Sequence, residues 1–143
     1  DMADVVKSKA AEQDIIIMTA AVADFCPSHP ADEKIKKNDS SYESVIELER
    51  TEDILSYLGA HKAKGQLICG FSMETQNMLE NSKAKLAKKN ADMIVANNLK
   101  VAGAGFGTDT NVVTLITADD CTELEIMDKS CVAARIMDRL LQM

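Results

Sequence analysis

The residues with the clearest chemical potential follow the first strongly apolar run of the chain. Residues 15–18 are Ile-Ile-Ile-Met, the next five are Thr-Ala-Ala-Val-Ala, and Asp24 comes directly after them. A lysine-rich segment, Glu-Lys-Ile-Lys-Lys, occupies residues 33–37. Small residues let a ligand approach the backbone, and lysines on a loop near a strand end suggest an anionic ligand such as a nucleotide. An ammonium group there would screen the negative charges of a carboxylate and a phosphate that must meet.

Polar residues also follow two later apolar runs. Residues 70–75 (Gly-Phe-Ser-Met-Glu-Thr) end the second run, and residues 96–98 (Ala-Asn-Asn) end the third. Open α/β sheets bind ligands just beyond the carboxyl ends of their strands, so the three ends predict one shared crevice. The alternative stays open that every strand has to end in something polar.

Two further lysines offer a second candidate feature. Lys85 and Lys89 are four residues apart and project from one face of a predicted helix, where they could clamp phosphates. Spacing alone favours an exposed basic stripe instead. The lysines of residues 33–37 could likewise be a solvated surface run, but their loop is long, and long loops in compact domains are often functional.

Several other kinds of site are disfavoured. The glycines of residues 103–107 lack the G-x-G-x-x-G spacing and precede a predicted strand, which argues against a dinucleotide loop. Neither His29 nor His61 has a plausible serine or cysteine partner for a catalytic triad. The four cysteines show no C-x-x-C spacing, so we interpret them as reduced, inert thiols rather than zinc ligands.

Composition and charge narrow the class of function. The net charge is −7 and aromatic residues make up 3% of the chain, so general nucleic-acid binding and base stacking are disfavoured. No apolar run reaches membrane-spanning length and no signal peptide is visible, so we expect a cytoplasmic protein. The length of 143 residues suits one domain, and the sequence indicates no internal domain boundary.

Alternating strands and helices must position these residues. Strands are predicted at residues 14–19, 44–48, 66–71, 92–96, 112–117 and 122–127, and loops at residues 26–41 and 97–110. Helices are predicted at residues 5–13, from the N-cap Thr51 until Gly65, and at residues 76–89 and 129–142. On the third helix, Met78, Leu79, Leu86 and Ala87 are predicted to face inward. The order predicts an α/β fold with a mostly parallel sheet, helices on both faces and a late antiparallel strand pair.

Four short segments of the chain match motifs that occur together in a known family. Residues 20–25, 33–37, 70–75 and 90–97 follow in the order of the motifs of phosphopantothenate–cysteine ligase, also called phosphopantothenoylcysteine synthetase. Over essentially its whole length the chain resembles the C-terminal part of bifunctional coenzyme A biosynthesis proteins, whose N-terminal half is a flavin-dependent decarboxylase. The resemblance implies a Rossmann-like three-layer fold.

The resemblance implies a two-step ligation. The carboxylate of 4′-phosphopantothenate attacks the α-phosphate of CTP, giving an acyl-cytidylate and pyrophosphate, and the amine of cysteine then displaces CMP. It implies Mg2+ or Mn2+ without a metal site of protein ligands, and FMN only on the fused or associated decarboxylase half. It also implies a cytoplasmic homodimer, for which the strands at residues 112–117 and 122–127 are the candidate assembly elements. The alternative that these strands simply pack on their own sheet stays open. We expect no nucleic-acid or membrane partner.

The resemblance also assigns site residues. Lys34 matches the first lysine of the family's K-x-K-K motif and would stabilise charge in the first step as the catalytic residue, and Asp24 matches a nucleotide-contacting aspartate. The implied nucleotide-binding residues are Ala20, Ala21, Asp24, Lys34, Glu52, Asp53, Ile54, Leu55, Phe71, Lys85 and Lys89.

Three departures from the family pattern are visible. Thr51-Glu52 stands where the family commonly has Asn-Pro, and Ser72-Met73 stands where Ala-Ala is commoner. The family's Gly-rich phosphate loop and Asp-Pro-Val-Arg motif do not occur in residues 1–143, so we expect the C-terminal portion of a single ligase domain, which binds CTP weakly at best and does not complete the ligation alone. The alternative is a non-catalytic nucleotide-binding or regulatory α/β domain. A dinucleotide-type oxidoreductase is disfavoured by the missing glycine motif.

Overall fold

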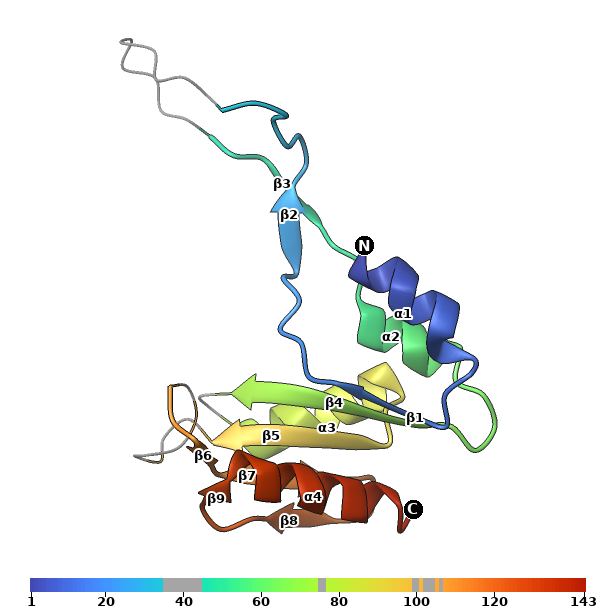
Figure 1. Cartoon of the computed structure of the whole chain (residues 1–143), viewed down its shortest axis with the longest axis vertical. Coiled ribbons are helices and arrows are strands. Elements are labelled where there is room, and N and C mark those ends of the chain that lie inside the picture. Colours follow the sequence, from blue (N-terminus) through green and yellow to red (C-terminus); the bar gives the residue numbers. More distant parts are fainter. Residues whose placement is uncertain (35–44, 75–76, 99–100, 102–104, 106) are drawn as a thin grey trace. The chain divides into compact units, whose positions relative to one another are not determined.

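Figure 1 shows the computed structural model of the chain, which describes residues 1–34, 45–74, 77–98, 101, 105 and 107–143. The chain divides into two compact units, of which the first comprises residues 1–19 and 54–143 and the second residues 20–53. The second and third lysines of the segment 33–37 and most of the glycine-rich segment 103–107 lie outside the described residues. Among the described residues, no helix combines the length and apolar character that a membrane span requires.

The first unit is built on a five-stranded sheet with the strand order β1-β4-β5-β7-β8. Its strands are β1 (Ile15–Met18), β4 (Leu67–Glu74), β5 (Met93–Asn98), β7 (Val113–Ile116) and β8 (Cys121–Glu123). β1, β4 and β5 are parallel, whereas β7 is antiparallel to both of its neighbours. The predicted mostly parallel sheet with a late antiparallel pair is thus confirmed, and the parallel strands end at one edge.

Helices cover both faces of this sheet, as predicted (Figure 1). They are α1 (Met2–Ala10), α2 (Ile54–Ala60), α3 (Met78–Lys89) and α4 (Lys129–Leu140). α4 packs its apolar side against one face, in a core that includes Met93 and Val95. α1 and α2 pack against the other face around Ile68.

Side chains of β4 alternate between these two faces, because successive residues of a strand point to opposite sides. Cys69 belongs to the core beneath α4, and Ile68 belongs to the core beneath α1 and α2. Both are 0% exposed. Burial on both faces explains why this strand reads in the sequence as an uninterrupted apolar run.

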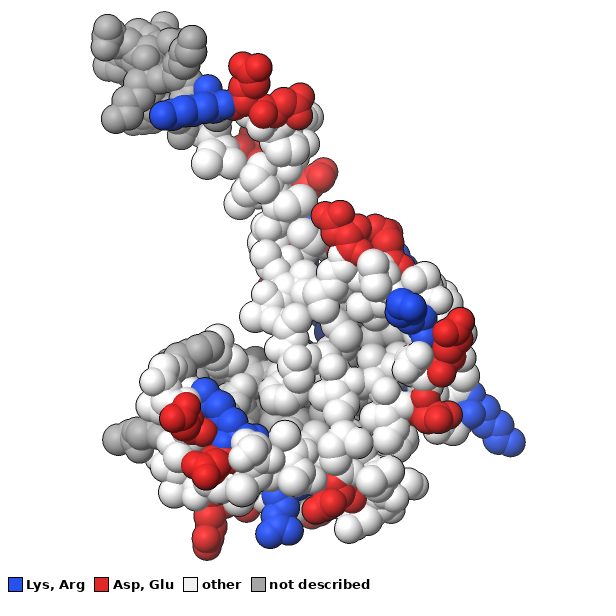
Figure 2. Space-filling model, viewed as in Figure 1, with Lys and Arg blue, Asp and Glu red and all other residues white. Residues whose placement is uncertain are grey.

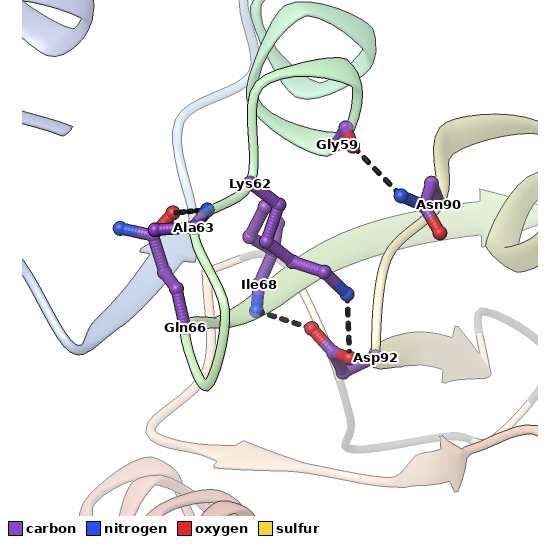
Figure 3. A network of polar contacts seen from close by, with 7 residues as sticks. All are labelled: Gly59, Lys62, Ala63, Gln66, Ile68, Asn90 and Asp92. Atoms are coloured by element: carbon purple, nitrogen blue, oxygen red, sulfur yellow. Dashed lines mark hydrogen bonds and ion pairs between the residues drawn. The ribbon is translucent and has the colours of Figure 1, made fainter. Parts of the chain in front are cut away.

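A polar network closes the amino edge of the sheet (Figure 3). Asp92 accepts hydrogen bonds from Lys62 Nζ at 2.8 Å and from the backbone N–H of Ile68 at 2.7 Å. Gln66 is 7% exposed and donates to two backbone carbonyls at the end of α1. These side chains satisfy buried backbone groups at the edge opposite the predicted crevice, so the Asp of the motif at residues 90–97 has a structural role.

Two short strands near the end of the chain extend the antiparallel part of the fold. β6 (Thr110–Asn111) pairs with β9 (Met127–Asp128), a pairing that the sequence does not predict. The predicted turn between β7 and β8 is confirmed, and Asp120 lies in it. The Thr122 hydroxyl and the backbone N–H of Cys121 donate to Asp120 and hold the pKa of its carboxyl below the usual value.

The second unit contains a two-stranded antiparallel hairpin. β2 (Phe25–Pro27) pairs with β3 (Leu48–Arg50), and the Arg50 guanidinium carbon lies 5.4 Å from the centre of the Phe25 ring. The prediction of a strand at residues 44–48 is therefore wrong, because the strand begins at the end of that range. The prediction of a loop over residues 26–41 is wrong at its first residues, which belong to β2.

Two exposed side chains explain the misplaced strand. Val45 and Ile46, whose alternation with glutamates suggested it, are 82% and 71% exposed. No described residue of the second unit is buried. Backbone pairing between segments distant in the chain fixes the hairpin, and local alternation does not reveal such pairing.

Helix α2 begins later than predicted. It starts at Ile54 rather than after an N-cap at Thr51. The Thr51 hydroxyl donates to the carbonyl of Ala23, and the Thr51 backbone N–H donates to the carbonyl of Asp24 at 3.0 Å. Thr51 therefore closes the hairpin of the second unit instead of capping a helix.

Candidate functional site

The carboxyl edge of the parallel strands is stepped. β1 ends at Met18, which pairs with Gly70, whereas β4 and β5 continue together to the pair of Glu74 and Asn98. Within the described residues, the last part of β4 therefore pairs with β5 on one side but not with β1 on the other. Open α/β sheets bind ligands beyond the strand ends at such interruptions of the strand order.

Lys85 reaches this step from α3. The N–H of Leu67 donates toward β1, to Asp14 O at 2.9 Å, and alternate residues of a strand turn their backbone groups the same way. The carbonyl of Phe71 therefore also faces the β1 side, beyond the last β1 pair. Lys85 Nζ donates to that carbonyl at 2.8 Å. One ammonium hydrogen is thus used to hold the lysine, and the group retains further donors.

Lys89 lies one turn further along the same face of α3. Its Nζ donates to the hydroxyl of Ser56 in α2 at 2.9 Å. Lys85 and Lys89 are both half-buried, whereas Lys83 and Lys88 are exposed. The interpretation of Lys85 and Lys89 as an exposed basic stripe is therefore wrong.

The inward face of α3 also differs from the prediction. Leu86 is buried as predicted, and Ser82 is buried as well, whereas Leu79 is 45% exposed and Ala87 is exposed. The Ser82 hydroxyl lies 2.7 Å from the Ser72 hydroxyl of β4. A polar contact with the strand thus sets the face of α3 that turns inward, so apolar spacing does not identify it.

Close contact between α2 and the end of α3 fixes the position of Lys89. A Cβ atom added to Gly59 would lie 1.8 Å from the carbonyl oxygen of Lys89, so only glycine fits there. Asn90 follows α3 in the left-handed conformation (φ 48°) and donates from Nδ2 to the Gly59 carbonyl at 2.7 Å (Figure 3). Glycine in one helix and a left-handed asparagine after the other therefore let the two backbones meet.

Two predicted site residues of α2 pack against the sheet, with Ile54 buried and Leu55 half-buried. Ile54 is 5% exposed and belongs to the core around Ile68. A Cβ atom added to Gly70 would lie 2.6 Å from Leu55 Cδ2, so this small residue within β4 accommodates Leu55 rather than open space. Any ligand contact from the buried Ile54 would come from its backbone.

The remaining predicted residues belong to the second unit. Asp24 precedes β2, and its backbone carbonyl is held by Thr51. Lys34 is exposed at the end of the described segment, and the alanines at positions 20 and 21 are exposed as well. The first unit thus brings together Phe71, Lys85, Lys89, Ile54 and Leu55, and the second carries Ala20, Ala21, Asp24, Lys34, Glu52 and Asp53.

Known proteins are similar to this chain along its whole length. The family described as the DNA/pantothenate metabolism flavoprotein C-terminal domain matches residues 1–143. The chain belongs to this family. The match confirms the resemblance drawn from the four ordered motifs.

Relatives of this chain include a named protein and a protein of solved structure. The coenzyme A biosynthesis bifunctional protein CoaBC of Bacillus subtilis (strain 168) is 47% identical over 141 residues, which cover 98% of this chain and 34% of the relative. The crystal structure of the C-terminal domain of a CoaBC protein has a TM-score of 0.77 and 40% identity, and the match covers 99% of this chain and 62% of that one. This chain therefore spans about a third of the length of the curated relative.

A more distant structure shares only the fold. A Cab2 mutant in complex with phosphopantothenate-cysteine has a TM-score of 0.64 and 18% identity, and the match covers 96% of this chain and 48% of the Cab2 chain.

On the face drawn in Figure 2, acidic and basic side chains are interspersed over the described residues. Burial, and to a smaller extent the charge of Asp92, raises the pKa of the Cys69 thiol to about 12, so this cysteine is inert at neutral pH. In the described part of the chain, no three His, Cys, Asp or Glu side chains are arranged to hold a metal ion.

Sequence reasoning did not identify the supporting residues of this site. Ser56, Gly59 and Asn90 fix the position of Lys89 through contacts between α2 and the end of α3. A glycine inside a helical pattern is the one visible signal, because glycine is costly there and usually has a packing reason. Nothing in the sequence marks Ser56.

Proposed function

We propose that the chain carries the nucleotide-binding part of a phosphopantothenate–cysteine ligase in coenzyme A biosynthesis. The observation that supports this most is the half-buried Lys85, held at the stepped strand edge, with Lys89 on the same face of α3, in a chain 47% identical to CoaBC. The fold is also shared with a protein that binds phosphopantothenate-cysteine. Lys85 is held by a neutral backbone carbonyl, so its positive charge can act on an anionic ligand.

In the proposed reaction, the carboxylate of 4′-phosphopantothenate attacks the α-phosphate of CTP. A phosphorus–oxygen bond forms, pyrophosphate leaves, and an acyl-cytidylate results. The cysteine amine then attacks the acyl carbon, CMP leaves, and an amide remains. Two anions meet in the first step, so lysine charges rather than an acid–base pair are the main requirement.

Individual residues would take distinct roles. Lys34 would stabilise the charge that develops in the first step, and Asp24 would contact the nucleotide. Lys85 and Lys89 would bind phosphate oxygens, and the backbone near Phe71 would line the pocket. Ala20, Ala21 and residues 52–55 would complete the nucleotide contacts.

A divalent cation, Mg2+ or Mn2+, would accompany the nucleotide. Mg2+ is typically held by substrate phosphates with one or two carboxylates. The cation would neutralise phosphate charge when bound. FMN would belong to a fused or associated decarboxylase half, and we propose a cytoplasmic homodimer.

Substitution of Lys34 tests the proposal. In the natural full-length protein that contains this domain, K34Q should lower the rate of ligation by about 100-fold or more, because one charge that stabilises the transition state is lost. The rate of phosphopantothenoylcysteine formation is measured with CTP, and circular dichroism checks the fold. K9Q removes an exposed lysine of α1 and is the matched control.

An unchanged rate for K34Q would refute the catalytic role of Lys34. Nucleotide binding without any ligation by the wild-type protein would favour a non-catalytic nucleotide-binding domain. Parallel titration with CTP and ATP decides the preferred nucleotide.

A further inference from the structure

A pair of asparagine side chains lies at the carboxyl end of β5. Asn97 is the next-to-last residue of β5, and Asn111 is the last residue of β6. Asn111 Nδ2 donates to Asn97 Oδ1 at 2.8 Å. Both residues are half-buried.

The backbone fixes which way these two amides point. The N–H of Val112 can only donate, and it donates to Asn111 Oδ1 at 3.0 Å. Asn111 therefore turns its NH2 group toward Asn97, and Asn97 must receive it with its oxygen. The NH2 group of Asn97 is left with two donors, and no described residue accepts from them.

Asn97 lies near the carboxyl ends of β4 and β5. It pairs in register with Met73, near the end of β4, and it shares the sheet face of Phe71 because Val95, two residues earlier, packs in the core on that face. Met73 is 53% exposed. A half-buried amide that a second amide orients, beside an exposed strand end, offers donors where open α/β sheets bind ligands.

We propose that Asn97 is a further substrate-binding residue of the ligase site and that Asn111 positions it. Asn97 donates from Nδ2 to an acceptor oxygen of a substrate. A phosphate oxygen of the nucleotide, a phosphate oxygen of phosphopantothenate and the carboxylate of cysteine share this chemistry. The inference rests on the proposed function, since the substrates are taken from it.

The decisive variant is N97D in the natural full-length protein. Aspartate has the same shape and still accepts from Asn111, but it offers no N–H donor and adds a negative charge that repels an anionic oxygen. KM should rise about tenfold or more for the one substrate that Asn97 contacts, since a hydrogen bond to a charged group is lost. KM for the other two substrates should change much less, and the unfolding midpoint should not fall.

Two further variants separate binding from folding. Q142E makes the same amide-to-carboxylate change after α4, at the chain end that Figure 1 places away from the arrowheads of β4 and β5, and should leave all three KM values unchanged. N97A removes the donors without adding charge and keeps the test valid if N97D does not fold. It should raise the same KM by a smaller factor.

The outcomes distinguish the inference from the proposed function. If the wild-type protein ligates and all three KM values of N97D and N97A equal the wild-type values, the role of Asn97 is refuted. If the wild-type protein does not ligate, the proposed function fails first. A rise in one KM with an unchanged unfolding midpoint supports the inference and names the substrate.

Discussion

Lys85 differs from its neighbour Lys83 in what its ammonium group touches. Lys85 donates to the carbonyl of Phe71, which has no β1 partner, while Lys83 is exposed. A lysine held at one hydrogen loses less freedom on binding a phosphate than a fully mobile one, because part of its ordering entropy is already lost in the free protein. The two lysines therefore provide a matched comparison within one helix.

We expect K85M to raise the KM for the nucleotide about tenfold or more, because a charge-assisted hydrogen bond to phosphate is lost. Steady-state kinetics with varied CTP measures this change. K83M, on the exposed side of α3, should stay within about twofold of wild type. Equal effects of the two variants would show that the half-buried position of Lys85 has no functional weight.

Cys69 should resist alkylation in the native protein. Its thiol is 0% exposed, and burial raises its pKa to about 12, whereas Cys121 and Cys131 are exposed. With iodoacetamide at pH 8, mass spectrometry should find Cys121 and Cys131 modified and Cys69 modified only after unfolding. Labelling of Cys69 at the rate of Cys131 would contradict its placement in the core.

The same thiol makes the stability of the folded protein depend on pH in the alkaline range. Its native pKa of about 12 lies above the ordinary value of 9.0, so the folded state keeps a proton that the unfolded state releases. The contribution of this buried thiol to the free energy of unfolding is complete below pH 9, and it is lost as the pH rises from there toward 12.

At the scale of elements, the contact between α2 and α3 depends on a glycine, Gly59. Gly59 lets the carbonyl of Lys89 approach the α2 backbone, and Asn90 adds a hydrogen bond to the same residue. Three elements then meet, because α3 also reaches β4 through Lys85 and the contact of Ser72 with Ser82. The lysines of the candidate site are thus positioned by helix packing.

We expect G59A to destabilise the protein by about 2 to 3 kcal/mol, because a methyl group at this position overlaps backbone that cannot move without shifting α3. Urea unfolding measures the loss. G65N is the control: Gly65 has φ 84° and open space around it, and asparagine tolerates this conformation at less than about 1 kcal/mol. A smaller loss for G59A than for G65N would contradict the close contact.

At the scale of the whole molecule, the buried core lies in one unit. Every buried apolar residue of the described chain belongs to residues 1–19 and 54–143. The second unit, residues 20–53, is a hairpin whose described side chains are all exposed or half-buried. The core therefore lies in the first unit, whereas the residues proposed for the chemistry are divided: Lys85 and Lys89 belong to the first unit, and Asp24 and Lys34 belong to the second.

Replacement of residues 21–52 with a Gly/Ser linker of about eight residues should leave cooperative unfolding intact, because loop length has a small effect on folding free energy. The thermal midpoint should change by less than about 5 °C. Circular dichroism follows the transition, and calorimetric titration with CTP should show weakened binding. Loss of the cooperative transition would show that the first unit needs the hairpin to fold.

The sequence by itself determined the parallel strands, the helices that cover them, the late antiparallel pair and the family. These features follow from apolar runs, helical spacing and ordered motifs, all of which are local. The tertiary structure alone decided the β2–β3 hairpin, the start of α2 at Ile54 and the inward turn of Lys85 and Lys89. It also decided that Asn111 orients Asn97. Each of these depends on contacts between residues far apart in the chain, and local pattern carries no information about which distant partner a residue meets.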